Sequence, residues 1–235
     1  MSKKISIIIC TYNEVNFIER SLKLIKNNLQ DVETIIVDDN SNDGTLKKLD
    51  EIKSNYDFSL FVRKHERVLA SAQIKGFREA TGKYIGTVDA NSLDQLLYFN
   101  KLADELDKGN DLAVLSRYIP GGGDQRIFIR AFASKSINTV SKFFLRIPFH
   151  DFTSGIFLMR KSLFNKTENI ITGYAEWFIE FVYFLHKKKY KIVEIPYVQT
   201  KDDESIESKS FPNLFTFFYL GSKYLIRVFL TILRN

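Results

Sequence analysis

Short apolar runs and helical patterns alternate along the first half of the chain. Residues 5–10 are apolar and rich in β-branched side chains, and apolar residues at helical spacing follow through Phe17, Leu22 and Ile25. The order repeats, with strands predicted at 33–37, 58–62, 84–88 and 113–115, and helices ending near 54 and spanning 69–80 and 93–108. We therefore predict an α/β fold whose mainly parallel central sheet is flanked by helices, with ligands at the carboxyl ends of the strands.

The second half is less regular, but we still predict one globular domain over residues 1–210. A glycine-rich loop at 120–124 precedes a basic amphipathic helix at 127–145, and a further helix is predicted at 177–188. Strands are expected at 157–159 and 191–195. Residues 199–210 carry mixed charges and almost no apolar side chain, which predicts a mobile loop.

Residues 211–235 are mainly aromatic and aliphatic, and we predict a C-terminal amphipathic helix there. Lys223 and Arg227 interrupt the segment, so its apolar stretches fall short of the roughly 20 residues that span a bilayer. On a helix its polar residues share one stripe, formed by Thr216, Lys223, Arg227, Thr231 and Arg234. This pattern predicts an interfacial helix whose basic residues attract anionic lipid; packing on the core or a dimer contact is the alternative.

Composition narrows the function only in part. The 235 residues are 45% hydrophobic and 26% charged, enough for one packed core, and the net charge of +6 suits nucleic acid, an anionic lipid surface or a phosphorylated substrate. Aromatic residues recur mostly at helix or strand spacing, which favours core packing over base stacking, so we expect no nucleic-acid partner. The single cysteine, Cys10, and the lack of an apolar leader before Ile5 favour the cytoplasm.

Carboxylates follow the predicted strands at the end where ligands bind. Glu14 comes after the first strand, Asp38 and Asp39 after the second, and Asp89 after the fourth. We expect them to converge at one edge of the sheet. An ionised group that ends an apolar strand is costly unless it meets a cation, a base edge or a sugar hydroxyl, which predicts a ligand site at the three aspartates. For Asp43, which precedes a helix, a capping role is favoured.

Eight segments share the order and spacing of a known family. They are residues 7–14, 35–45, 69–72 with Gly76, 80–91, 116–118, Arg130 with Ser134, 151–155 and 207–209. Over about residues 4–209 the chain resembles family 2 glycosyltransferases, in particular their dolichyl-phosphate mannosyltransferase and polyprenyl-phosphate glycosyltransferase branch. The resemblance implies a GT-A-like fold and inverting transfer of a sugar from GDP-mannose or a UDP-sugar to a polyprenyl or dolichyl phosphate. Together with the features that favour the cytoplasm and the amphipathic C-terminal segment, this leads us to expect peripheral attachment to the cytoplasmic face of a membrane.

The resemblance implies a role for each site residue. The residues implied to bind the nucleotide sugar are Thr11, Tyr12, Glu14, Asp39 and Ala90. Those implied to hold Mg²⁺ or Mn²⁺ on the diphosphate are Asp89 and Asn91. Those implied to grip the acceptor phosphate and the leaving diphosphate are Arg117, Arg130, Ser134 and Lys209, and the implied catalytic residues are Asp89, Asn91, Arg117 and Arg130. A lipid phosphate is already anionic and needs no strong general base, which agrees with three histidines that lie far apart.

The chain departs from the family pattern at the metal motif. Asp-Ala-Asp reads Asp89-Ala90-Asn91, so a neutral amide replaces a carboxylate. Leu93 stands at the usual glutamine, with Asp94 or Gln95 as open substitutes. Further departures are Val68 and Ala70 in place of glycine, and Lys201 as the candidate for an expected arginine. The alternative function is therefore that of a catalytically weakened or inactive glycosyltransferase-like binding protein.

Overall fold

A seven-stranded sheet forms the centre of the molecule. The structure is a computed structural model that describes residues 4–91, 93–201 and 214–234. In spatial order the strands are β3 (Ser59–Val62), β2 (Val32–Asp38), β1 (Ile5–Thr11), β4 (Tyr84–Asp89), β7 (Phe157–Arg160), β5 (Leu112–Ser116) and β8 (Ile192–Pro196). Neighbours run parallel except at β7, which is antiparallel to β4 and β5. The prediction of a mainly parallel α/β sheet is confirmed.

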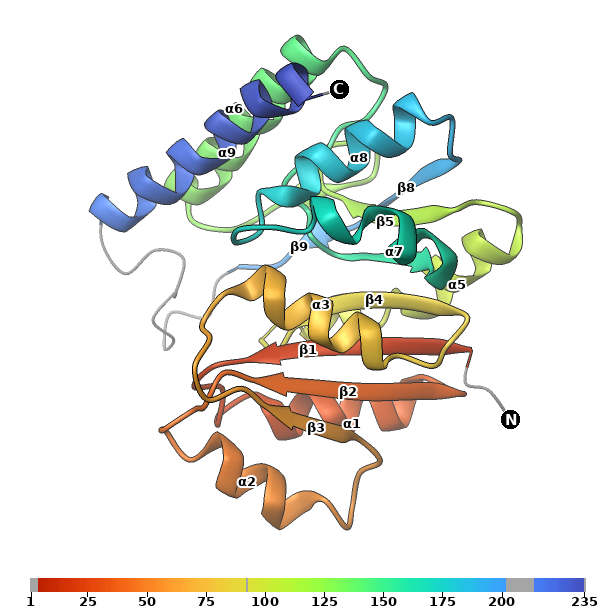
Figure 1. Ribbon diagram of the computed structural model, residues 1–235, viewed down its shortest axis with the longest axis vertical. Helices are drawn as coiled ribbons and strands as arrows, with labels where there is room; N and C mark the ends of the chain where they lie inside the picture. Colours follow the sequence, from red (N-terminus) through yellow and green to blue (C-terminus); the bar gives the residue numbers. More distant parts are fainter. Residues whose placement is uncertain (1–3, 92, 202–213, 235) are drawn as a thin grey trace.

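Helices cover both faces of this sheet (Figure 1). They are α1 (Ile18–Asn28), α2 (Thr45–Ile52), α3 (Leu69–Glu79), α4 (Leu93–Leu96), α5 (Phe99–Asp107), α6 (Phe128–Leu145), α7 (Lys161–Thr167), the 3₁₀-helix η1 (Glu168–Ile170), α8 (Trp177–Lys187) and α9 (Leu214–Arg234). Successive residues of a strand point to opposite faces. Ile7 and Ile9 accordingly pack with α1, α2 and α5, and Ile8 packs with α3, α7 and α8, so each face has its own buried core.

Some details of the second half were not predicted. The helix expected over residues 93–108 is broken at Leu97 and Tyr98 into α4 and α5, so the prediction of one helix was wrong. The ring of Tyr98 lies edge-on to that of Tyr197, with centroids 6.2 Å apart. A second, parallel sheet pairs β6 (Gly123–Asp124) with β9 (Val198–Gln199). Of the predicted loop over 199–210, Gln199 belongs to β9, and residues 202–210 lie outside the described residues.

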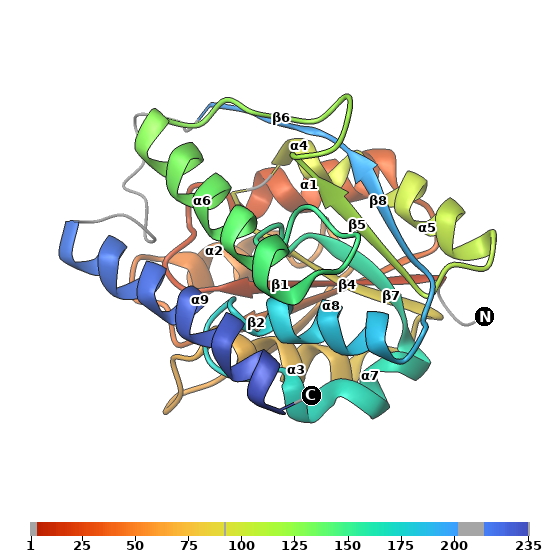
Figure 2. The ribbon, with the colours of Figure 1, turned by 90° about the horizontal axis from the view of Figure 1, so that it is seen from above.

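The long helices α6 and α9 lie side by side, as two perpendicular views show (Figures 1 and 2). α9 also packs on α8, and its buried positions include Arg227, Val228 and Thr231. Arg227 donates a hydrogen bond to Glu180 of α8 at 2.8 Å and another to the carbonyl of Thr172 at 2.9 Å. This part of the polar stripe faces the protein, and the expectation that Arg227 meets anionic lipid was wrong. Within the described ranges, every helix is too short or too polar to cross a bilayer.

Candidate functional site

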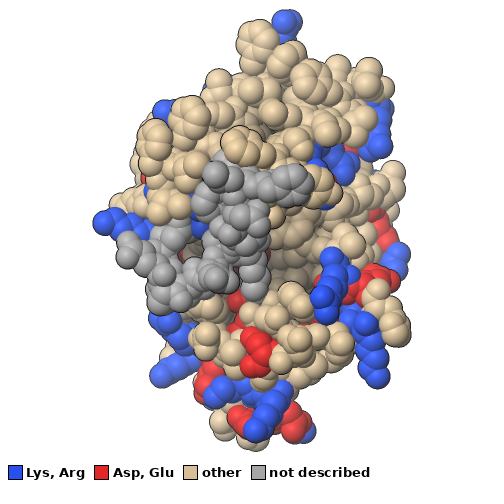
Figure 3. Space-filling view, turned by 90° about the vertical axis from the view of Figure 1, so that its left-hand side faces the viewer, with Lys and Arg blue, Asp and Glu red and all other residues tan. Residues whose placement is uncertain are grey.

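The predicted acids meet at the carboxyl edge of β1, β2 and β4. In the parallel register Thr11 lies beside Asp38, and Cys10 lies beside Asp89, so the turns after these strands adjoin one another. Figure 3 looks onto this edge, where acidic and basic side chains gather in the lower part and the upper part is largely uncharged. The expected convergence of the strand-end carboxylates is therefore confirmed.

Asp38 stabilises the turn after β2 and is not available to a ligand. Its carboxylate is fully buried and accepts hydrogen bonds from the Thr11 hydroxyl at 2.7 Å, the Ser41 hydroxyl at 2.6 Å and the Ser41 amide at 2.8 Å. These three donors satisfy a charge that would otherwise be costly to bury. The prediction of a ligand at Asp38 was wrong, and the Thr11 side chain, expected to bind the nucleotide sugar, instead holds this turn.

The loops after β1 and β2 are braced against each other. The Glu14 amide donates to the Thr45 hydroxyl at 2.9 Å, and the Val15 amide donates to Asp43 at 3.1 Å. Asp43 also accepts from the Thr45 amide at 2.9 Å, while Gly44, with a φ of 102°, occupies the cap position of α2. Asp43, one residue before the cap position, thus accepts the hydrogen bond that stabilises the start of α2. Because both loops are fixed, the position of Glu14 is fixed with them.

Asp39 lies at the same edge and is held by an arginine that was not among the predicted site residues. Arg63, directly after β3, donates from Nε to Oδ1 at 2.7 Å and from Nη2 to Oδ2 at 2.8 Å. Burial raises the pKa of Asp39 and outweighs the guanidinium of Arg63, which lowers it. Beside this pair, the guanidinium of Arg67 lies over the ring of Tyr12, 4.5 Å from its centroid. A basic residue at the end of the third strand was the available sequence signal for Arg63.

The segment Asp89-Ala90-Asn91 follows β4 at the same edge. Asp89 and Asn91 are exposed, whereas Ala90 is buried and its carbonyl accepts a hydrogen bond from Ser21 of α1 at 2.5 Å. The described residues contain no cluster of three or more histidine, cysteine or acidic side chains that could enclose a metal. One carboxylate and one amide oxygen nevertheless fit Mg²⁺ or Mn²⁺, which commonly takes its other ligands from substrate phosphates and water.

Of the two candidates to replace the missing glutamine, Gln95 is committed elsewhere. It is buried and donates to Gln199 of β9 at 3.0 Å. Gln199 also accepts from the hydroxyl of Tyr197 at 2.8 Å. Asp94 is exposed at the start of α4. Gln95 therefore fastens α4 to the second sheet, and Asp94 is the better placed of the two to face a ligand.

Arg117 was expected to grip phosphate, but it is buried in an ion pair. Its Nε and Nη2 donate to the two oxygens of Asp151 at 2.8 and 2.6 Å, and Nη2 also donates to the Thr153 hydroxyl at 2.8 Å. Burial lowers the pKa of Arg117, yet the charge and hydrogen bonds of Asp151 raise it well above its usual range. Arg117 thus remains charged and orders the 151–153 turn, a supporting role that replaces the predicted direct contact.

Ser134 and Arg130 lie one turn apart on α6, next to this turn. The hydroxyls of Ser134 and Thr153 are 2.8 Å apart, and the Asn138 amide donates to Thr153 at 2.8 Å. Arg130 is half-buried in the first turn of α6. The structure therefore brings Arg117, Arg130 and Ser134 to one end of α6. Lys209, the fourth predicted member of this group, lies outside the described residues.

A second arginine near Arg117 was also missed. Arg126 donates from Nε and Nη2 to the two oxygens of Asp124 at 2.8 and 2.6 Å, and Asp124 lies 3.6 Å from Nη1 of Arg117. Burial raises the pKa of Asp124, but the hydrogen bonds and charge of Arg126 lower it more, so the net shift is downward. The charges of these two arginines are balanced by two aspartates, Asp124 and Asp151. Both arginines are therefore held in ion pairs within the chain.

The two groups of predicted site residues lie at the same edge of the sheet. β4 and β5 both run antiparallel to β7, so their carboxyl ends share one edge. Asp89 ends β4, and Arg117 directly follows β5. The residues predicted to bind the nucleotide sugar and those predicted to bind phosphate therefore adjoin the same sheet edge.

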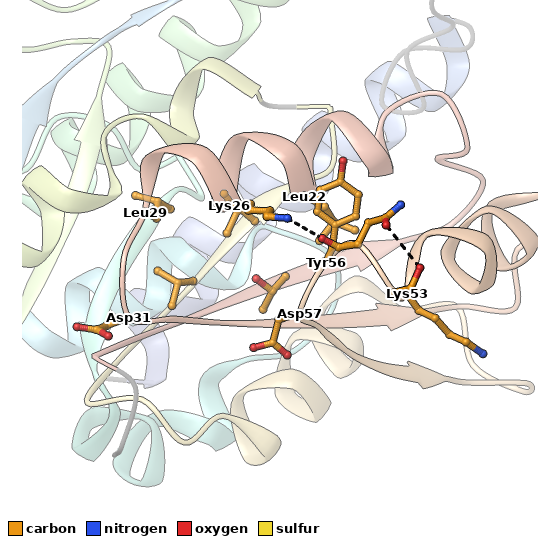
Figure 4. Close-up of a pocket in the computed structure, with 12 residues that line it drawn as sticks. Leu22, Lys26, Leu29, Asp31, Lys53, Tyr56 and Asp57 are labelled. Atoms are coloured by element: carbon orange, nitrogen blue, oxygen red, sulfur yellow. Dashed lines mark hydrogen bonds between the residues drawn. The ribbon is translucent and has the colours of Figure 1, made fainter.

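A cavity of 560 Å³ lies at the opposite end of the strands (Figure 4). It is lined by α1, the start of β2 and residues 53–57, and the Lys26 ammonium donates to the carbonyl of Asn55 across it at 3.0 Å. The cavity contains none of the predicted site residues. Its charged groups belong to separate elements and do not converge, so we assign it no part in the chemistry.

Comparison with known proteins identifies the family. The model of the family "Glycosyl transferase family 2" matches residues 6–168, more than half of the chain. The chain belongs to this family. A dolichol-phosphate mannosyltransferase of Pyrococcus furiosus is 33% identical over an alignment of 218 residues, and the match covers 88% of this chain and 60% of that protein. A polyprenol monophosphomannose synthase of Mycolicibacterium smegmatis is 28% identical over 88% of this chain and 82% of its own length.

Solved structures share the fold at lower identity. A mannosyltransferase from Pyrobaculum calidifontis in complex with GDP-Man and Mn²⁺ matches with a TM-score of 0.64 and 17% identity over 100% of this chain and 65% of its own. Glucosyl-3-phosphoglycerate synthase from Mycobacterium tuberculosis, with Mn²⁺, UDP and phosphoglyceric acid, has a TM-score of 0.73 and 13% identity, covering 97% of this chain and 78% of its own. The family resemblance and the GT-A fold predicted from the sequence are confirmed.

Proposed function

We propose that this family 2 chain transfers a hexose from a nucleotide-diphosphate sugar to a polyprenyl or dolichyl phosphate. GDP-mannose is the favoured donor because the relatives include enzymes named dolichol-phosphate mannosyltransferase and polyprenol monophosphomannose synthase; a UDP-sugar is the second choice. The observation that carries the proposal is the single carboxyl edge shared by Asp39, Asp89 and Asn91, with Arg117 directly after β5 at the same edge. The chain spans 60% of the length of the P. furiosus relative, so the lipid-phosphate acceptor is a proposal for this chain.

The donor side would bind the nucleotide sugar with residues that the fold already holds in place. Asp39 accepts hydrogen bonds from the nucleoside, with Tyr12 and Glu14 as neighbours at the same edge. Asp89 and Asn91 would hold Mg²⁺ or Mn²⁺, which neutralises charge on a departing diphosphate when it is bound. The exposure of both side chains allows substrate phosphates and water to supply the remaining ligands.

The acceptor side would bind a lipid phosphate through Arg130 and Ser134, with Lys209 retained as a prediction. Arg117 and Asp151 hold the turn on which Thr153 meets Ser134. A phosphate oxygen is anionic near neutral pH, so attack on the sugar needs orientation rather than a strong base. The ring of His150 is bonded to Glu194 at 2.8 Å. Attack opposite the leaving diphosphate gives the inversion that we propose.

Helices α6 and α9 bury polar side chains and expose aromatic ones, which supports binding at a membrane surface. The buried positions of α6 include Ser134, Asn138 and Ser141, and α9 buries Arg227 and Thr231. Phenylalanines are exposed instead, and we call the following set the aromatic face: Phe128, Phe132, Phe143, Phe144, Phe218 and Phe229. The rings of Phe144 and Phe229 lie 5.2 Å apart and join the two helices. Exposed aromatic side chains gathered on two adjacent helices are typical of lipid or protein contacts.

We place a lipid bilayer on the aromatic face because the proposed acceptor is itself a membrane lipid. The phosphate-binding residues Arg130 and Ser134 belong to the same helix as Phe128 and Phe132, so an acceptor in the bilayer would meet them without leaving it. Peripheral attachment to the cytoplasmic face, with residues 211–235 as a distinct membrane-contacting segment, stays part of this proposal. A dimer contact is the alternative occupant.

Release of the nucleotide diphosphate tests the proposed function. The purified chain is incubated with GDP-mannose or UDP-glucose, Mg²⁺ or Mn²⁺, and a short polyprenyl phosphate in detergent, and free GDP or UDP is measured. We expect release that depends on both the lipid phosphate and the metal. Nucleotide binding without any release would favour the noncatalytic binding protein suggested by Asn91.

A further inference from the structure

Arg63 uses every N–H group of its guanidinium within the chain. Beyond the two bonds to Asp39, Nη1 donates to Ser71 at 2.6 Å and to Glu66 at 2.9 Å, and Nη2 donates to the carbonyl of Val68 at 3.1 Å. Its backbone amide also donates to the carbonyl of Asp38 at 2.8 Å. A guanidinium has five N–H donors, and five are accounted for here. The side chain is 11% exposed, so these bonds form largely out of solvent.

These bonds join the turn after β2 to the segment that precedes and begins α3. Asp39 follows β2, whereas Glu66, Val68 and Ser71 precede or begin α3. The second segment also contains Arg67, whose guanidinium lies over Tyr12 at 4.5 Å. Arg63 therefore sets the distance between the Asp39 carboxylate and the segment that contacts Tyr12.

We propose that Arg63 is a positioning residue for nucleoside binding, acting through Asp39. This inference rests on the proposed function, since it assumes a nucleoside diphosphate at this edge. An ionised carboxylate offers about four lone-pair sites. Arg63 occupies two of them, and we assign the others to N–H or O–H donors of a base or ribose. The planar, two-point contact fixes the carboxylate in a way that a lysine ammonium cannot reproduce.

The test measures GDP and UDP affinity by calorimetry in Arg63→Gln, Arg63→Lys and Ser71→Ala. We expect Arg63→Gln to weaken binding of the preferred nucleotide about 10- to 100-fold, the range for losing hydrogen bonds to a charged group. Arg63→Lys keeps the charge and should fall in between, and Ser71→Ala should cost a few-fold. Arg78→Gln is the matched control, because Arg78 is a largely exposed α3 arginine paired with Glu168, and its affinity should equal that of the wild type.

A double-mutant cycle separates positioning from direct contact. In the background of Asp39→Asn, Arg63→Gln should cause no further loss of nucleotide affinity, because its effect passes through the carboxylate. The KM for the polyprenyl phosphate should stay unchanged in each variant, which a general loss of structure would not allow. Additive losses would show that Arg63 contacts the nucleotide itself and would overturn the positioning role.

Other outcomes are equally decisive. Wild-type affinity in folded Arg63→Gln, with folding checked by circular dichroism and thermal unfolding, would overturn the inference. If that variant does not fold, unchanged affinity in both Arg63→Lys and Ser71→Ala overturns it. Failure of the wild type to bind either nucleotide would instead refute the proposed function.

Discussion

Replacing Phe128 and Phe132 together by serine should release the protein from membranes. Full burial of a phenylalanine side chain contributes about 1.5–3 kcal/mol. Phe128 is 83% exposed and Phe132 is 60% exposed, so insertion of these surfaces would contribute at most about 1.2–2.5 and about 0.9–1.8 kcal/mol. The double variant should therefore bind vesicles about 30- to 1000-fold more weakly. Both side chains project from the first turns of α6, so the core should stay intact.

Vesicle flotation with anionic phospholipid liposomes measures this partition. Leu60→Ser is the control, because Leu60 is also exposed, at 37%, but lies on β3 away from the aromatic face. Substitution is preferable to removal of residues 211–235, since truncation would delete Arg227 and leave Glu180 buried without its partner. Equal flotation of the double variant and the wild type would refute the membrane assignment. A change from dimer to monomer on gel filtration, with flotation unchanged, would assign the face to a dimer contact.

Four further substitutions test other parts of the account. Asp89→Ala should abolish metal-dependent nucleotide release, and retained activity in excess chelator would exclude Asp89 as a metal ligand. Asn91→Asp should tighten Mn²⁺ binding measured by calorimetry, and no gain in affinity would exclude Asn91 as a metal ligand. Arg130→Lys should lower turnover at least about tenfold because lysine cannot make the two-point contact of arginine with a phosphate, while the Kd for GDP stays unchanged. Normal turnover would exclude Arg130 from binding the acceptor phosphate. Asp151→Asn should lower the free energy of unfolding by about 3–5 kcal/mol in urea denaturation because Arg117 stays charged and buried, and a loss below about 1 kcal/mol would contradict this ion pair's structural role.

The order of strands and helices could be predicted from the sequence because buried parallel strands are continuous apolar runs. Residues 5–10, 33–37 and 84–88 lie within β1, β2 and β4. The same logic located the strand-end acids, since parallel strands share one carboxyl edge. It failed where a distant contact decides the local structure, as at Tyr98, whose ring packs on Tyr197 where the expected single helix breaks.

The partners of the charged side chains could not be predicted from spacing along the chain. Arg117 and Asp151 are 34 residues apart, and Arg63 and Asp39 are 24 apart, so only the folded chain shows that they pair. Helical periodicity likewise defined the polar stripe of α9 but not which way it faces. Glu180, 47 residues before Arg227, supplies the buried acid that turns this part of the stripe inward.

Mass spectrometry of the lipid product tests the central claim most directly. The purified chain is incubated with GDP-mannose, Mn²⁺ and a short polyprenyl phosphate in liposomes, with Asp89→Ala as the inactive control and 3-phosphoglycerate as a competing acceptor. The account predicts a polyprenyl phosphate that is heavier by one hexose with the wild type and unmodified with Asp89→Ala. Hexose on 3-phosphoglycerate alone, or an unmodified lipid in every reaction although GDP-mannose binds, would contradict it.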